Sequence, residues 1–426
     1  MKKVVFKNGL TFIYKHVENN LTSFSIAFEA GANLELKEEE YGLSHAVEHM
    51  VFKGTENFTE EEINKTLDRV FGFNNAMTNF PYVIYYGTLL SQDFEEGFKL
   101  YSDIVLNPSF PEEGFKEEIE VIIEELKEWK EDVHQFCEDE LLYNAFNQRR
   151  IKELIIGNEK NLRNMTLHSI KNFYDKYYRA NNCVISVVSS LEFERVFNIV
   201  KSIFGSWDKV LTDENPYIRG ENIYEDNKEG IFVKNIEGLE GSKIQILFPI
   251  HELTEEEVKV LRVFNVAFGE GTSGILYDEI RTKKGLAYEV GSTIKNEKGI
   301  KVYKIYLGTS KNKTMQAISI IKNKIEEVKE KRGFFTEEKI DQLIKSLELK
   351  RSIALEKSIV QSMNLALYEL MYGNRDEQDL DKEYILNNSY NSPLYSELRN
   401  LSEINEEMIL STINKVFKNA TIQILA

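Results

Sequence analysis

The predicted elements of this chain occur in one order, and that order is repeated. In each half of the 426 residues, short strands lead into helices and a strand pair, and long helices then precede a further helix and strand. The tripeptide Leu-Arg-Asn occurs in both halves, at residues 162–164 and 398–400, before that helix and strand. A repeat of this length indicates duplication. We expect an α+β fold of two homologous tandem domains, each an antiparallel-rich β-sheet packed with several α-helices.

The domain limits follow from the length and from a polar segment between the halves. At roughly 150 residues per domain, the chain is too long for one ordinary core. Residues 212–227 are polar and contain Pro216 and Gly220, which is typical of a linker. We therefore predict an N-terminal domain at 1–211, a linker at 212–227 and a C-terminal domain at 228–426.

Local signals predict several helix boundaries. Helical periodicity covers residues 43–53, and a second helix follows Thr59, an N-cap residue that precedes three glutamates. The acidic helical pattern that follows is predicted to break near Asp132. In the second half, the pattern predicts a short helix at 275–281 and one long helix at 337–372.

Composition excludes several classes of protein. A formal charge of -17 argues against nucleic acid and anionic membranes as partners. No apolar run approaches the roughly 18 residues of a membrane span, and residues 1–6 are typical of a strand, not a signal peptide. Two cysteines, Cys137 and Cys183, exclude a disulfide framework and favour a reducing compartment. We expect a cytoplasmic protein.

The segment 42–54 carries the strongest chemical signal, a His-x-x-Glu-His pattern on a predicted helix. His45 and His49 are four residues apart, so both imidazoles project from one face and can share an ion. Glu48 lies at the rim of that face, where it can reach a water without being a ligand. This spacing is known from zinc hydrolases.

A catalytic zinc ion needs a third protein ligand, and the helix after Pro111 offers several glutamates. At about 100° per residue, Glu118 and Glu125 lie nearly together at the margin of the apolar stripe, whereas Glu124 points toward solvent. Glu118 and Glu125 are the carboxylates that can face an interior site. For either one, a solvated helix face is the alternative.

These motifs resemble the insulinase and pitrilysin family of inverse-motif zinc peptidases, in its short, mitochondrial-processing-peptidase-like form. The resemblance rests on residues 42–56, on 75–78 and on 118–126, where Glu125 follows His49 by 76 positions. It implies a metalloenzyme LuxS/peptidase-like fold, one Zn²⁺ per chain with His45, His49 and Glu125 as ligands, and Glu118 as a supporting residue.

The same resemblance implies a substrate site. Arg281 and Tyr288 match the family's arginine and tyrosine pair, which contacts substrate near the scissile bond and usually comes from a partner chain. Because this chain contains both the zinc residues and the arginine and tyrosine pair, the resemblance implies a homodimer, with the pair acting across the interface. Asn75, Ala76 and Met77 match the edge strand along which the peptide pairs; an ordinary strand and turn is the alternative.

The resulting prediction is a zinc metalloendopeptidase that cleaves short or unfolded peptides inside a chamber formed by a dimer. Glu48 is its general base, Tyr288 stabilises the oxyanion, and Arg281 positions the substrate. Two alternatives are an active subunit of a heterodimer with a non-zinc partner and a non-catalytic accessory subunit. Acidic residues concentrate at 35–40, 56–62 and 112–140, beside the zinc residues, and predict a preference for basic peptides.

Overall fold

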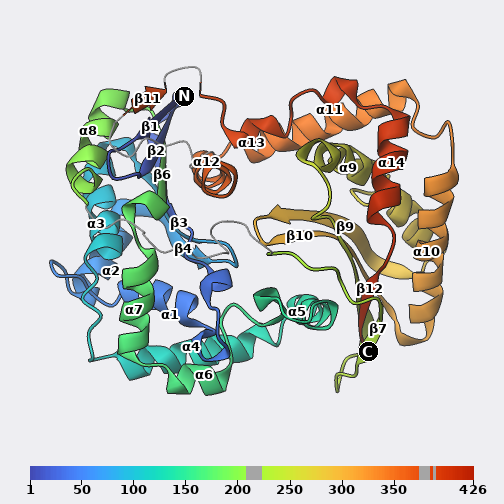
Figure 1. Cartoon of the computed structure of the whole chain (residues 1–426), viewed down its shortest axis with the longest axis horizontal. Coiled ribbons are helices and arrows are strands. Elements are labelled where there is room, and N and C mark those ends of the chain that lie inside the picture. The colour runs from blue at the N-terminus through green and yellow to red at the C-terminus, as the bar shows by residue number, and fades with distance from the viewer. Residues whose placement is uncertain (208–222, 374–383, 387–389) are drawn as a thin grey trace. The chain divides into compact units, whose positions relative to one another are not determined.

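The computed structural model describes residues 1–207, 223–373, 384–386 and 390–426 (Figure 1). It divides into two compact units. Unit 1 comprises Met1–Leu126, Leu154–Glu221 and Ile353–Ser396, and unit 2 comprises Lys127–Glu153, Asn222–Ser352 and Glu397–Ala426. Of the predicted linker at 212–227, residues 212–222 lie outside the described residues.

Unit 1 is built on a seven-stranded mixed sheet with the order β11-β1-β2-β6-β3-β5-β4. Strand β6 runs parallel to β2 and antiparallel to β3, with Phe24 opposite Val187. The strands are β1 (Lys2–Val5), β2 (Thr11–His16), β3 (Leu21–Phe28), β4 (Phe71–Thr78), β5 (Val83–Leu90), β6 (Cys183–Ser189) and β11 (Tyr384–Leu386).

The helices of unit 1 bury an aromatic core against this sheet. Phe24 of β3 meets the rings of Phe71, Phe94, Phe98 and Tyr101, all at edge-to-face angles. The helices are α1 (Leu43–Val51), α2 (Glu60–Val70), α3 (Phe94–Leu106), α4 (Phe115–Trp129, assigned to unit 1 as far as Leu126), α6 (Glu159–Asn164), α7 (Leu167–Tyr177), α8 (Phe193–Phe204), α12 (Ser358–Tyr372) and α13 (Pro393–Ser396).

Unit 2 contains a five-stranded sheet with the order β7-β12-β8-β10-β9. Its apolar core lies between one face of this sheet and the helices α9, α10, α11 and α14. Helix α5 packs on β8 and β12. The elements are α5 (Val133–Ala145), β7 (Gly230–Lys234), β8 (Gly241–Pro249), α9 (Glu255–Phe268), the π-helical turn η6 (Tyr277–Thr282), β9 (Ala287–Glu297), β10 (Ile300–Ser310), α10 (Thr314–Glu330), α11 (Glu337–Ala354), α14 (Glu406–Val416) and β12 (Thr421–Leu425).

The two sheets share one strand permutation. The segment β2-β6-β3-β5-β4 of unit 1 corresponds to β7-β12-β8-β10-β9 of unit 2: first strand, last strand, second, fourth and third in chain order. The polarities also agree, because β6 and β12 each run parallel to the first strand and antiparallel to the second. The predicted α+β class is confirmed, and the shared topology supports duplication.

The compact units differ from the predicted domains because each unit contains one helical segment from the other half of the sequence. Residues 127–153, with α5, belong to unit 2, and residues 353–396, with α12, belong to unit 1. Helix α12 packs on β3 and β6 of unit 1. Its Ser362 hydroxyl donates to Ser25 Oγ at 3.0 Å and lies 2.8 Å from Ser186 Oγ.

Two predicted helices need correction. The pattern at 337–372 forms α11 and α12 with a break between them, where Gln361 donates to the Leu355 carbonyl and Ser358 bonds Ser23 across to β3 at 2.8 Å. The helix predicted at 275–281 is for most of its length the π-helical turn η6. The predicted break near Asp132 is confirmed, because Asp132 is the N-cap of α5.

The structure also describes the two cysteines and the lengths of the helices, which bear on two predictions drawn from composition. Cys137 and Cys183 are both free and buried, so no disulfide joins them. Among the described residues, the structure has no helix with the length and apolar character needed to cross a membrane.

Candidate active site

Helix α1, which carries the His-x-x-Glu-His pattern, begins at a position that requires glycine. Gly42 has φ of 100°, and a Cβ there would lie 2.7 Å from the Ile156 carbonyl oxygen. The buried Glu35 caps the helix: its carboxylate accepts from Gly42 N at 3.1 Å, from Ser44 N at 2.8 Å and from Ser44 Oγ at 2.6 Å. Glu35 thus fixes the turn from which the histidines project.

His45, His49 and Glu125 offer a set of donor atoms that fits a zinc ion. One donor atom from each lies within 4.8 Å of the others. Glu125 Oε1 is 3.7 Å from His45 Nε2, and Glu125 Oε2 is 3.4 Å from His49 Nε2. Ligands about 2.1 Å from an ion at tetrahedral angles are about 3.4 Å apart, so the spacing matches. Two imidazoles and a carboxylate also leave a fourth position open.

Glu118 supports this donor set from the other side of His49. Its Oε1 lies 2.8 Å from His49 Nδ1, and its Oε2 lies 3.1 Å from Lys53 Nζ. Lys53 in turn pairs with Glu60 at 2.6 Å. A carboxylate on Nδ1 fixes the ring and its tautomer, so that Nε2 is presented as a ligand.

When no ion is bound, the surroundings shift the pKa values of the two imidazoles in opposite directions. Burial, followed by the charge of His49, lowers the pKa of His45 to about 4. Burial also acts to lower the pKa of His49, but hydrogen bonds with Glu118 and Glu125 overcome it and raise that pKa to about 9. His45 is therefore neutral at pH 7, and an ion that takes His49 must displace a proton.

Glu48 lies on the same helix but is not among the grouped donor atoms. Thr78, the last residue of β4, donates its hydroxyl hydrogen to Glu48 Oε2. Burial raises the pKa of Glu48, and the hydrogen bonds from Thr78 oppose that rise. A partly buried carboxylate of raised pKa beside a metal-binding group has the chemistry of a general base.

Strand β4 forms one edge of the unit 1 sheet and carries the predicted peptide-binding residues. Asn75, Ala76 and Met77 pair with β5 on one side, and no strand within the described chain pairs with the other side. The exposed backbone of an edge strand is the surface to which an extended peptide adds. Because Thr78 continues this strand, the edge leads directly to Glu48.

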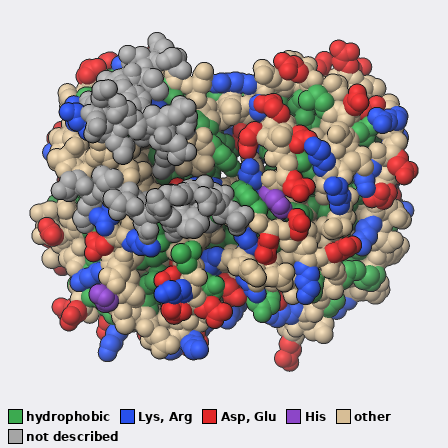
Figure 2. All heavy atoms as spheres, viewed as in Figure 1, with side chains coloured by type: hydrophobic (Ala, Val, Ile, Leu, Met, Phe, Trp, Pro, Cys, Tyr) green, Lys and Arg blue, Asp and Glu red, His purple; other side chains and the backbone are tan. Residues whose placement is uncertain are grey.

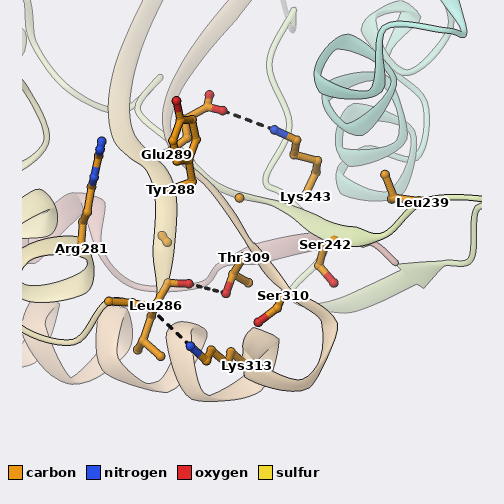
Figure 3. Close-up of a pocket in the computed structure, with 14 residues that line it drawn as sticks. Leu239, Ser242, Lys243, Arg281, Leu286, Tyr288, Glu289, Thr309, Ser310 and Lys313 are labelled. Atoms are coloured by element: carbon orange, nitrogen blue, oxygen red, sulfur yellow. Dashed lines mark hydrogen bonds and ion pairs between the residues drawn. The ribbon is translucent and has the colours of Figure 1, made fainter.

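Arg281 and Tyr288 lie together in unit 2, whereas the metal-binding group lies in unit 1. The Arg281 guanidinium carbon is 5.3 Å from the Tyr288 ring centre and 4.9 Å from that of Tyr277. Arg281 is on η6 and Tyr288 is on β9, where its side chain is 84% exposed. Both residues line a pocket of unit 2 (Figure 3).

The sequence patterns did not identify three residues of this site. Thr78 follows the predicted edge strand, but no spacing rule links it to Glu48. Lys53 lies one turn beyond His49, but its partner Glu118 is on another helix, so no spacing rule links the two. Glu35 falls in the acidic run at 35–40, and at seven residues before the N-cap Gly42 it is too distant for the usual capping signals.

Comparison with known proteins shows the family of this chain. The family model "Insulinase (Peptidase family M16)" matches residues 12–159, and "Peptidase M16 inactive domain" matches residues 164–347. The chain belongs to the insulinase family, peptidase family M16. In this family the first half thus corresponds to the peptidase domain. Helix α9, which follows β8 as α1 follows β3, contains no histidine, in keeping with an inactive second domain.

Relatives in the M16 family cover most of the chain. An uncharacterized zinc protease of Rickettsia felis is 26% identical over 97% of this chain and 94% of its own, and one of Bacillus subtilis is 25% identical over 89% and 90%. The crystal structure of a protease from Helicobacter pylori superposes with a TM-score of 0.84 at 21% identity, covering 100% of this chain and 99% of the other. The last comparison concerns the fold alone.

Proposed function

We propose that this chain is a zinc-dependent endopeptidase that hydrolyses peptide bonds in short or unfolded peptides. The observation that carries the proposal is the convergence of His45, His49 and Glu125 next to the partly buried carboxylate of Glu48. The M16 family and the relatives named zinc proteases support the same reading. A cytoplasmic location is part of the proposal and is favoured by the two free cysteines.

His45, His49 and Glu125 would hold the ion, and Glu118 would keep the His49 ring in place. A zinc ion bound there supplies Lewis-acid activation of water and of the scissile carbonyl. Glu48 takes the proton of the attacking water and delivers it to the leaving amine nitrogen. Thr78 occupies Glu48 Oε2, which leaves Oε1 for this proton transfer.

The second half of the proposal concerns Arg281 and Tyr288. We propose that they act in trans, in a homodimer in which the pair from one chain completes the site of the other. The exposure of Tyr288 supports this, because an 84% exposed tyrosine held against an arginine is available to a substrate or partner. There Tyr288 donates a hydrogen bond to the developing oxyanion, and Arg281 orients the peptide.

The preferred substrate in this proposal is an extended peptide that pairs with β4. Backbone pairing by itself gives little side-chain selectivity. The acidity near the zinc residues favours basic peptides, although part of it serves the fold: Glu35 caps α1, and Glu62 caps α2 together with Thr59. On the face drawn in Figure 2, acidic and basic side chains are interspersed.

The deciding experiment measures zinc content and cleavage of unstructured peptides for the wild type, Glu48→Gln and Glu124→Gln. We expect Glu48→Gln to keep its zinc and to lose activity by about 100-fold or more. Glu124, an exposed neighbour of Glu125, provides the matched control and should keep both properties. Normal cleavage by zinc-loaded Glu48→Gln would overturn the mechanism.

The other two roles predicted from sequence remain distinguishable by experiment. An accessory subunit would cleave no peptide even with zinc bound, and a heterodimer subunit would be inactive until a second, different chain was added. Mass in solution together with activity of the purified chain separates both from an active homodimer.

A further inference from the structure

The pocket that contains Arg281 and Tyr288 has a charge unlike that of the whole chain. It lies within unit 2 and has a volume of about 530 Å³ (Figure 3). Its walls are the start of β8, residues 285–289 at the start of β9, the end of β10 and Lys313. Three cationic side chains line it, against one acidic side chain, in a chain whose formal charge is -17.

Among the described residues, only one of the three cations pairs with a carboxylate. Lys243 Nζ pairs with Glu289 Oε2 at 3.3 Å. Arg281 and Lys313 have no carboxylate partner among the described residues; Lys313 Nζ meets only the Gly285 carbonyl oxygen, at 3.5 Å. Figure 3 shows Lys243 directed toward Glu289 and Lys313 at the other edge of the group of lining residues. An unneutralised cation in a concave site attracts an anionic group.

The remaining walls indicate what carries that anion. Leu239, Leu286, Ala287 and the Tyr288 ring supply apolar surface, and Ser242, Thr309 and Ser310 lie between them and the cations. Helix α10 begins next to the pocket at Thr314 and has no acidic residue in its first turn, so its N-terminus adds to the positive potential. An apolar wall beside cations fits a carboxylate on an organic stem better than it fits an inorganic ion.

We infer that this pocket binds a carboxylate of the peptide substrate, with Lys313 as its counter-ion. The carboxylate is either the C-terminal one or that of an Asp or Glu side chain. The inference rests on the proposed peptidase function and assigns a substrate class to it: peptides that present a carboxylate to unit 2, whatever their charge at the edge strand.

Two peptide pairs test the inference and separate the two sources. The first pair differs only in a free or amidated C-terminus, and the second differs only in Glu or Gln at one internal position, scanned along the peptide. We expect the wild type to favour the carboxylate member of one pair by about tenfold in kcat/KM at low salt, and this preference to shrink at high salt.

Lys313→Met should bring that preference ratio toward one. Lys311→Met is the matched control, because Lys311 is exposed and does not line the pocket, and it should keep the wild-type ratio. The same peptides, labelled with a fluorophore, give dissociation constants with the full-length Glu48→Gln protein, so that the pocket is tested without turnover.

Equal rates and equal affinities within both pairs would overturn the inference while the peptidase function stood. A ratio that Lys313→Met left unchanged would also overturn it. Failure of the zinc-loaded wild type to cleave any peptide would instead contradict the proposed function, and the binding measurement would still decide whether the pocket takes a carboxylate.

Discussion

The two carboxylate oxygens of Glu48 have different neighbours, and this gives Thr78 a specific part in the chemistry. The Thr78 hydroxyl donates to Oε2. Replacement by valine keeps the shape of the side chain and removes this donor. We expect Thr78→Val to lower kcat by about 10- to 100-fold with little change in KM, because a hydrogen bond to a charged group contributes about 1.5–3 kcal/mol. Steady-state kinetics with a neutral peptide measure the effect.

The control for this prediction is Thr78→Ser, which retains the hydroxyl group and should retain most of the activity. Zinc content should be equal in all three proteins, because Thr78 contacts Glu48 and none of the grouped donor atoms. Valine and serine variants with the same kcat would show that the hydroxyl does not orient the base.

At the residue scale, the sequence predicts which side chains share a helix face, because helix periodicity determines this. His45 and His49 share a face because they are one turn apart, and Glu118 and Glu125 share a face because they are two turns apart. The contacts Thr78–Glu48 and Glu118–Lys53 join different elements, so no local period encodes them. Such pairs become visible only when tertiary packing brings the elements together.

At the scale of the elements, helix α5 makes contacts that the sequence patterns do not predict, because its polar side chains face a sheet. Glu138 pairs with Lys304 of β10, and Asn144 Nδ2 donates to Gln423 Oε1 of β12 at 2.9 Å. Burial disfavours ionised Glu138, but Lys304 holds its pKa below the ordinary value. Asp139, the next residue, forms no ion pair with a cation among the described residues, and burial raises its pKa to about 6.

This difference predicts a pH dependence of stability. Because the folded protein holds the Asp139 proton up to about pH 6 and the unfolded chain releases it near 3.8, stability falls as pH rises between these values. The loss amounts to about 3 kcal/mol by the linkage relation. Asp139→Asn does not titrate, so its stability relative to wild type should increase by up to about 3 kcal/mol from pH 4 to pH 7.5.

Urea unfolding of both proteins at the two pH values, followed by the fluorescence of Trp129, measures this difference. Trp129 is a suitable probe because its Nε1 donates to Asp139 at 2.9 Å. A difference between the two proteins that stays constant with pH would show that folding does not raise the pKa of Asp139.

Sequence patterns located most elements but not the partners of α5 and α12. The predicted break near Asp132 falls on a residue type that often caps helices, whereas the break between α11 and α12 has no glycine or proline. It is made by hydrogen bonds of Ser358 and Gln361. Periodicity reports that a helix has an apolar face, but it does not report which sheet covers that face.

At the scale of the whole molecule, duplication accounts for the presence of both the histidine motif and the arginine and tyrosine pair in one chain. The topologically equivalent sheets differ in the residues that we propose for the site: the first half has the histidine helix α1, and the second half has Arg281 and Tyr288 but no histidine in α9. A duplicated chain of this kind can divide a site between its two halves, and pairing two chains then yields two equivalent mixed sites.

A mixed dimer tests this division of labour. Glu48→Gln and Tyr288→Phe chains, co-expressed with different tags and purified through both tags, form dimers with one chain of each kind. If Tyr288 acts across the interface, one site of each mixed dimer is fully wild type and the other carries both substitutions, so we expect roughly half of the wild-type activity per dimer. Each variant alone should be nearly inactive, because every site then lacks either the base or the oxyanion donor.

A mixed dimer as inactive as its parents would show that Tyr288 serves the zinc site of its own chain. A monomeric wild type with full activity would contradict the dimer altogether.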